Sequence, residues 1–149
     1  MIQDQLQNDL KNAQLARDEI KVSTLRLLLS EIKNAQIQKG ETLLGDSEII
    51  SIIQREVKKR KEAAAGFRLG MREEAALKEE AESKILEAYL PAQLSNEELT
   101  KIVVESITEV GASSIQDMGK VIGKVMQRVA GRSDGGTVSA IVKEKLSNG

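Results

Sequence analysis

The chain has 149 residues, of which 40% are hydrophobic and 30% are charged, and its formal net charge is −1. This composition excludes an intrinsically disordered chain and a membrane protein, and the length allows one domain or two small ones. Histidine and cysteine are both absent, which removes the commonest general base, the commonest metal ligands and all disulfides. We therefore expect a cytoplasmic protein without a metal, a cofactor, a signal peptide or a membrane span.

Four helices are predicted before the single proline, Pro91, because helix-forming residues are abundant and apolar residues recur at three- and four-residue steps. Gly66 and Gly70 predict that the third helix weakens and turns between them, with a bent continuation of the helix as the alternative. Pro91 ends the fourth helix, since its ring clashes with the preceding turn. The sequence thus predicts an all-α fold that begins with an N-terminal four-helix domain at residues 1–90.

Three more helices are predicted after the proline, and each has its own start signal. Ser95 and Glu98 form a capping box for the fifth helix, and Ser114 and Asp134 are placed to cap the sixth and the seventh. These helices form a C-terminal three-helix domain at residues 91–149. The apolar stripe of the sixth helix is predicted to contain Ile115, Met118, Ile122, Val125 and Val129.

A basic run, KKRK at residues 58–61, lies within the third predicted helix. Glu56 and Glu62 flank the run and partly neutralise its charge. We therefore interpret it as an exposed helical surface in preference to a nucleic-acid patch.

Gly119 and Gly123 lie inside the sixth predicted helix, where each costs about 1 kcal/mol relative to alanine. Their four-residue spacing places them on one face. Either another backbone packs closely against this face, which we favour, or the bare face admits a ligand such as a nucleic-acid backbone.

Four basic residues follow the same helix at four-residue intervals and line up along one side of it. They are Lys120, Lys124, Arg128 and, just beyond the helix, Arg132. Against Asp117 alone, they give residues 113–132 a local charge of +3, from four cations minus one acid. Because the whole chain is nearly neutral and poor in aromatic residues, an RNA partner would have to be recognised through this local basic patch and through the fitted shape of the RNA. These four residues are the RNA-binding candidates.

The turn GRSDGGT before the last helix has a superficial likeness to a phosphate-binding loop, but it lacks the lysine and the preceding strand of that motif. The N–H groups at the start of a helix can still hold one phosphate. Asp134, Gly135 and Gly136 are therefore candidates for a turn that holds a phosphate.

No catalytic residue is indicated by the sequence. The paired acids, such as Glu73 with Glu74, occupy polar helical positions that are typical of a solvated face or the first turn of a helix. An enzyme with carboxylate chemistry remains a third hypothesis, to be supported by two carboxylates that converge in a cleft with shifted pKa values.

Three separated motifs carry a resemblance: TLRLLLSEIKNAQI in the second helix, YLPAQLSNEEL around the proline, and GASSIQDMGKVIGKVMQRVAGRSDGGTV near the end. Across the whole chain these motifs resemble the YqeY family of small bacterial proteins. The last stretch is also similar to the C-terminal tail domain of GatB, a component of glutamyl/aspartyl-tRNA amidotransferase. Gln116 and Gly136 depart from the pattern, since family members often have lysines at these two places.

The resemblance implies a GatB/YqeY-type three-helix bundle at the C-terminus and a module that contacts tRNA or associates with the amidotransferase, and that is not catalytic by itself. A label of carbon–nitrogen ligase with glutamine as amide donor would be inherited from the larger enzyme. The second hypothesis is a helical adaptor that binds another protein through the groove between its two parts. The two are distinguished by whether the four predicted basic side chains stay solvent-exposed on one face or are paired with acids of the N-terminal domain.

Overall fold

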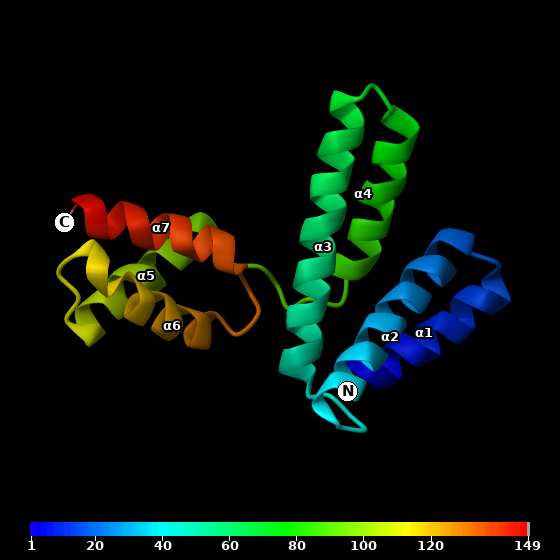
Figure 1. Cartoon of the computed structure of the whole chain (residues 1–149), viewed down its shortest axis with the longest axis horizontal. Helices are drawn as coiled ribbons and strands as arrows, with labels where there is room; N and C mark the ends of the chain where they lie inside the picture. The colour runs from blue at the N-terminus through cyan, green and yellow to red at the C-terminus, as the bar shows by residue number, and fades with distance from the viewer. Residues whose placement is uncertain (149) are drawn as a thin grey trace. The chain divides into compact units, whose positions relative to one another are not determined.

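The computed structural model describes residues 1–148, and all the regular structure in this range is helical (Figure 1). The prediction of an all-α protein is therefore confirmed for the described residues. Gly149, the last residue of the predicted C-terminal domain, lies outside them. The elements in chain order are α1 (Ile2–Ala16), α2 (Glu19–Lys39), α3 (Asp46–Leu69), α4 (Glu73–Glu87), α5 (Asn96–Val110), the 3₁₀ turn η1 (Ile115–Asp117), α6 (Met118–Val129) and α7 (Gly135–Asn148).

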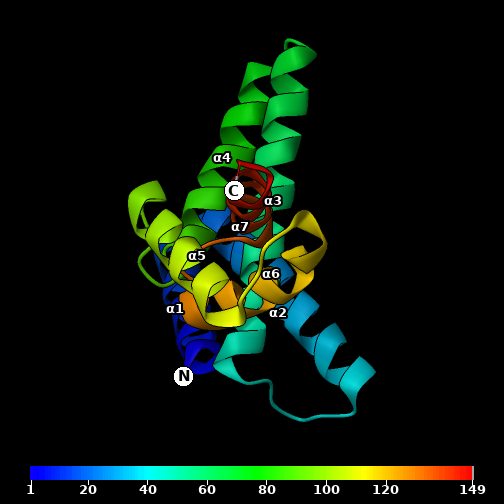
Figure 2. The same cartoon turned by 90° about the vertical axis from the view of Figure 1, so that its left-hand side faces the viewer.

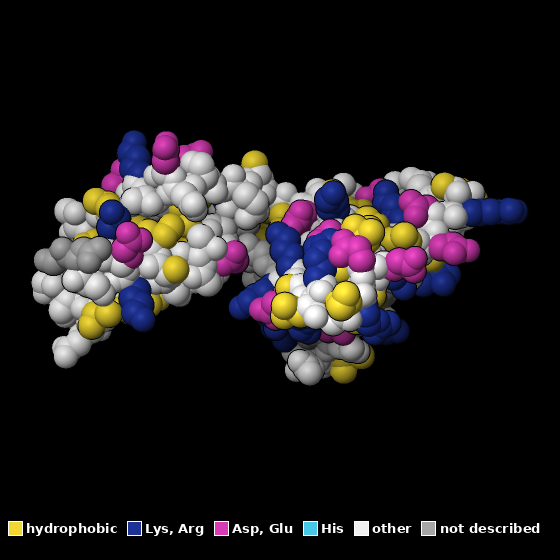
Figure 3. All heavy atoms as spheres, turned by 90° about the horizontal axis from the view of Figure 1, so that it is seen from above, with side chains coloured by type: hydrophobic (Ala, Val, Ile, Leu, Met, Phe, Trp, Pro, Cys, Tyr) yellow, Lys and Arg dark blue, Asp and Glu magenta, His cyan; other side chains and the backbone are white. Residues whose placement is uncertain are grey.

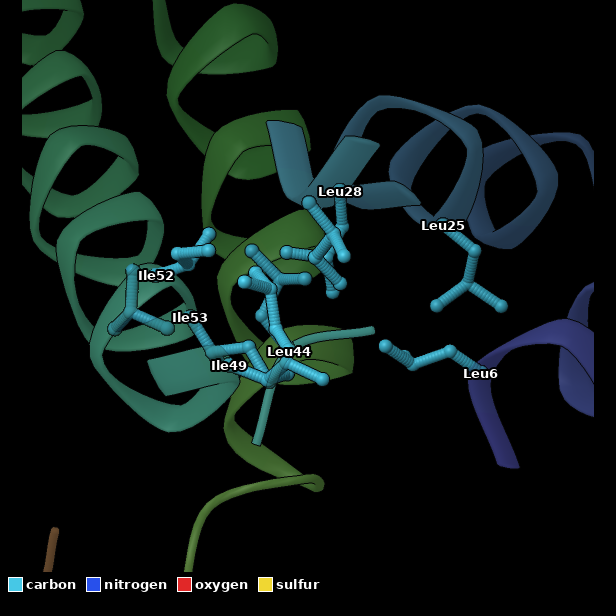
Figure 4. Close-up of a cluster of buried hydrophobic side chains, with 10 residues drawn as sticks. Leu6, Leu25, Leu28, Leu44, Ile49, Ile52 and Ile53 are labelled. Carbon is cyan, nitrogen blue, oxygen red and sulfur yellow. The ribbon is translucent and has the colours of Figure 1, made fainter. Parts of the chain in front are cut away.

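The chain divides into two compact units, Met1–Leu90 and Pro91–Gly149. In the first unit, α1 and α2 form one antiparallel helical hairpin, and α3 and α4 form another (Figures 1 and 2). Figure 4 shows Leu6 of α1 and Leu25 of α2 pointing toward one another in the core of this unit. The buried core residues are Leu6, Leu25, Leu28, Ile32, Leu44, Ile49, Ile52, Ile53, Val57 and Leu86.

The α3–α4 hairpin corrects two predictions. Helix α3 continues through Gly66 as far as Leu69, and the turn begins at Gly70, because packing along α4 stabilises the helix where its own sequence is weak. Arg60, expected on an exposed surface, is buried, because its guanidinium lies between Glu79 and Glu82 of α4. The other three residues of the basic run are exposed, as predicted.

The second unit contains α5, η1, α6 and α7 around an apolar core of its own. Each buried valine or leucine here contributes on the order of 2 kcal/mol. The buried core residues are Leu99, Val103, Val121, Val125, Val129, Val138, Val142 and Leu146.

The predicted stripe of α6 was partly wrong. Val121 is fully buried although it was not in the stripe, whereas Ile115 is 46% exposed and Ile122 is only half-buried. For Ile115 the physical reason is that it lies in the 3₁₀ turn η1 and not in α6. Three residues per turn, in place of 3.6, shift the direction in which the earlier residue points.

Candidate binding face on helix α6

The start of α6 is fixed by Asp117. One oxygen of its carboxylate, Oδ2, accepts hydrogen bonds from the backbone N–H groups of Ser113 and Ser114, at 3.0 and 3.3 Å. These two bonds hold the pKa of the Asp117 carboxyl below its ordinary value. Ser114, which the sequence predicts as the cap of this helix, takes the N-cap position of the 3₁₀ turn η1 that leads into α6, and its backbone N–H is bonded to Asp117.

The end of α6 is fixed by Arg132. Ala130 and Gly131 adopt left-handed backbone conformations, with φ values of 46° and 85°, so the chain folds back on the last turn. The Arg132 guanidinium then donates hydrogen bonds to the backbone carbonyl oxygens of Arg128 and Val129, both at 2.9 Å. Arg132 thus caps the C-terminal end of α6, and two of its N–H donors are bonded to backbone carbonyl oxygens of that helix.

Two of the remaining RNA-binding candidates are paired with acids of α5. The Arg128 guanidinium lies 2.8 Å from Glu105, and the Lys124 ammonium lies 3.5 Å from Glu109. These side chains are partly exposed, so each pair contributes little to stability, but it neutralises the cation locally. Lys120 is exposed, and the charge near it is that of Asp117. Lys120, Lys124 and Arg128 of α6 therefore form a surface of mixed charge together with Glu105 and Glu109 of α5.

The glycine face of α6 is open. A Cβ atom added to either Gly119 or Gly123 would meet no atom of another element within 4 Å. Both residues are exposed, as is Gln127 on the same side, whereas the valines of α6 point to the opposite side. Within the C-terminal unit, no element therefore packs closely against these glycines, contrary to the explanation that we favour from the sequence, and the bare face is open.

The turn before α7 carries its own anion. The Asp134 carboxylate accepts hydrogen bonds from the backbone N–H of Thr137 at 2.6 Å and from its hydroxyl at 3.0 Å. A Cβ on Gly136 would lie 3.3 Å from the same carboxylate. A phosphate held by Gly135 and Gly136 would have to lie beside this negative charge, which disfavours binding of an anion at the turn.

Within residues 1–148, the structure gives little support to the hypothesis of an enzyme with carboxylate chemistry. Glu79 and Glu82 converge in the α3–α4 hairpin, but on the Arg60 guanidinium, and neither carboxylate lines the groove beside Ala64 and Ser83 or the groove beside Val22 and Leu27. In the described part of the chain, no three acidic side chains gather as they would around a metal ion. None of the described helices combines the length and the apolar character needed to cross a membrane.

Comparison with known proteins places this arrangement in context. Residues 3–146 match the family model described as Yqey-like protein. The chain is 32% identical over 145 residues to "Altered inheritance of mitochondria protein 41, mitochondrial" of Pyrenophora tritici-repentis, a match that covers 93% of this chain and 77% of the relative.

Proteins of the same name from Kluyveromyces lactis and Vanderwaltozyma polyspora are each 36% identical to the chain, over 124 and 85 residues. These two matches cover 80% and 57% of this chain, and 66% and 46% of the respective relatives. The matched segments therefore span between about half and three quarters of the lengths of these three relatives.

The expectation of a cytoplasmic location is overturned by these relatives, since their names identify them as mitochondrial proteins. The physical basis of that expectation was weak. A chain without cysteine is insensitive to the redox state of its surroundings, so its composition does not distinguish one compartment from another. The three names mention neither tRNA nor an amidotransferase, and contact with either stays a hypothesis.

Proposed function

The chain belongs to the Yqey-like protein family, and from this premise we propose that it is a helical adaptor that binds a partner protein through the open face of α6. We further assign residues 91–149 to a GatB/YqeY-type three-helix bundle. The shared apolar core of α5, α6 and α7 supports this assignment. In this proposal the bundle presents α6, and the chain is not catalytic by itself.

The observation that carries the proposal is the open pair of glycines. Gly119 and Gly123 together cost about 2 kcal/mol of helix stability, and no contact within the C-terminal unit uses the space that they leave. A helix surface without side chains lets another backbone approach closely. A partner helix lying across these glycines would contact the α6 backbone directly and would bury it.

The charges beside this face favour a protein over RNA. Lys124 and Arg128 are paired with Glu109 and Glu105, so a phosphate backbone would meet acids as well as bases. Binding of nucleic acid depends on several unpaired cations that displace counterions. A protein surface with alternating charges complements this mixture of Lys, Arg and Glu better than a polyanion does. The amidotransferase is one protein partner of this kind that the resemblance implies.

Site-specific cross-linking in cells tests the proposal. A photoreactive amino acid at Gln127, on the open face, should cross-link to a defined protein that is then identified by mass spectrometry. The same group at Glu144, on an exposed part of α7, is the matched control and should give no such product. Gly123→Leu fills the open face and should abolish the Gln127 cross-link, while circular dichroism confirms that the helices remain.

The alternative, contact with tRNA, is tested in the same cells by sequencing cross-linked RNA. Binding of tRNA is then compared between the wild type and the triple variant Lys120→Glu, Lys124→Glu and Arg128→Glu. If wild-type protein binds tRNA at physiological salt more tightly than a duplex of equal length, and the folded triple variant does not, the RNA hypothesis replaces the adaptor. A cross-linked protein that persists in Gly123→Leu would show that the partner does not use the glycine face.

A further inference from the structure

The outer part of the α3–α4 hairpin extends beyond the apolar core of the N-terminal unit. The core residues nearest to it are Val57 on α3 and Leu86 on α4. Farther out, the buried residues between the two helices include the alanines Ala64 and Ala76 and the Arg60–Glu82 ion pair, none of which is a large apolar side chain. Helices gain most of their stability by packing an apolar face against another element. This part of the hairpin has few large apolar side chains to pack, so it gains little stability in this way.

An open groove of about 760 Å³ runs along one side of this outer part. Its floor includes the small residues Ala64, Ala65 and Ser83. Small side chains at a contact let a further helix approach closely. Leu69, at the outer end of the groove, is 89% exposed. Figure 3, which looks down on the α3–α4 turn, shows hydrophobic side chains among acidic and basic ones at this end of the hairpin.

The rims of the groove carry opposite charges. Lys61 and Arg68 line it on α3, and Glu80 and Glu87 line it on α4. Lys61 pairs with Glu87 at 2.7 Å, and Arg68 pairs with Glu80. In each helix the two charged residues are seven apart, which corresponds to about 10 Å along the axis. A row of cations and a row of acids with equal spacing therefore face each other across the groove.

This arrangement is self-complementary under a two-fold rotation. When a second hairpin faces the first in the same direction, about a two-fold axis parallel to the helices, α3 of each copy lies opposite α4 of the other. Lys61 then meets Glu87 of the second copy, and Arg68 meets its Glu80, because the residues of each pair lie at the same height along the hairpin. Lys84, a further cation of the groove, lies between Glu80 and Glu87 on α4, and these acids offset its charge.

We propose that this groove is a self-association surface, in which the α3–α4 hairpin of a second copy packs to form a four-helix arrangement. The mixed rims argue against other occupants. A nucleic acid or an anionic membrane would be repelled by the acids of α4, and an unrelated helix would need the same two charge rows at the same spacing. A second copy has both the row of cations and the row of acids. Its hairpin would also pack over the outer part of the first hairpin, which is open in one copy.

Sedimentation equilibrium of the full-length chain over a wide concentration series tests the proposal. The average mass of the wild type should rise with concentration toward twice the mass of one chain. Ala65→Trp places a large side chain on the exposed floor of the groove without removing an ion pair, and it should raise the dimer dissociation constant about tenfold or more. Circular dichroism should show unchanged helicity.

A mixing experiment tests the charge pattern. Lys61→Glu with Arg68→Glu makes both rims acidic, and Glu80→Lys with Glu87→Lys makes both rims basic, so each double variant alone should remain monomeric. An equimolar mixture should dimerise, because α3 of one variant then faces the oppositely charged α4 of the other. The control, Lys59→Glu with Lys78→Glu, reverses two exposed cations that do not line the groove, and it should dimerise as the wild type does.

Some outcomes would overturn the proposal. A wild-type chain that stays monomeric throughout the series has no self-association surface, and the groove would then have another occupant or none. A dimer of unchanged affinity in folded Ala65→Trp would place the contact elsewhere. Failure of the two folded charge variants to associate when mixed, although the wild type does, would exclude pairing of α3 with α4 between copies.

Discussion

The hydroxyl group of Tyr89 donates a hydrogen bond to the Asp9 carboxylate at 2.5 Å, across 80 positions of the chain. Asp9 lies on α1, and Tyr89 lies just after α4, so this bond ties the first helix of the N-terminal unit to the end of the last. Burial of the hydroxyl, together with its bond to the nearby carboxylate, raises the pKa of Tyr89. The neutral hydroxyl is therefore the form that stabilises the fold.

Tyr89→Phe should lower the free energy of unfolding by about 1 kcal/mol near pH 7, as expected for a partly exposed hydrogen bond. The raised pKa means that this stabilisation is fully present below pH 10.0, the ordinary value for tyrosine, and is lost as the pH rises through the folded value. Urea denaturation from pH 7 to pH 11 measures both effects. A difference between wild type and variant that grows above pH 10 would contradict the assigned role.

Gly119→Ala and Gly123→Ala should each raise the free energy of unfolding by up to about 1 kcal/mol, because the added methyl group enters open space and alanine favours the helix. Gly111→Ala is the matched control. Its φ of +68° is unfavourable for alanine, so it should destabilise by about 1 kcal/mol although the space around it is equally open. Destabilisation by both helical substitutions, seen in thermal melts, would mean that the face is packed after all.

Asp117→Asn should lower the melting temperature at pH 7, because the charged carboxylate accepts the N–H groups at the start of α6. Since the pKa of Asp117 is lowered in the folded state, its contribution is present above pH 3.8 and is lost as the pH falls below that value. The difference in melting temperature should therefore shrink in acid. Glu144→Gln, which removes a carboxylate from an exposed site on α7, is the control for the loss of one negative charge.

Limited proteolysis should cut the chain between residues 90 and 96, where it runs without regular structure between α4 and α5. The backbone N–H of Leu94 is bonded to the Arg132 carbonyl at 2.9 Å, so we expect the cut before Leu94. Each fragment contains a core of its own and should remain helical. Cleavage inside helices while this segment resists would show that the two predicted domains do not fold separately.

The helices themselves could be predicted from the sequence because their signals are local. Ser95 and Glu98 are three residues apart, and the structure contains their capping contacts, with Glu98 N–H donating to the Ser95 hydroxyl at 3.1 Å. The end of α4 before Pro91 follows from the geometry of one ring. The sequence by itself thus determined the all-helical class, most helix boundaries and the motifs that carry the family resemblance.

The tertiary structure decided which helical faces are free. Arg60 is buried because Glu82, 22 positions later, lies opposite it on α4. Arg128 is paired because α5 places Glu105, 23 positions earlier, beside it. The face with Gly119 and Gly123 is open for the same kind of reason, since neither α5 nor α7 packs over it. Periodicity shows which residues share a face, but what covers that face depends on how distant helices pack.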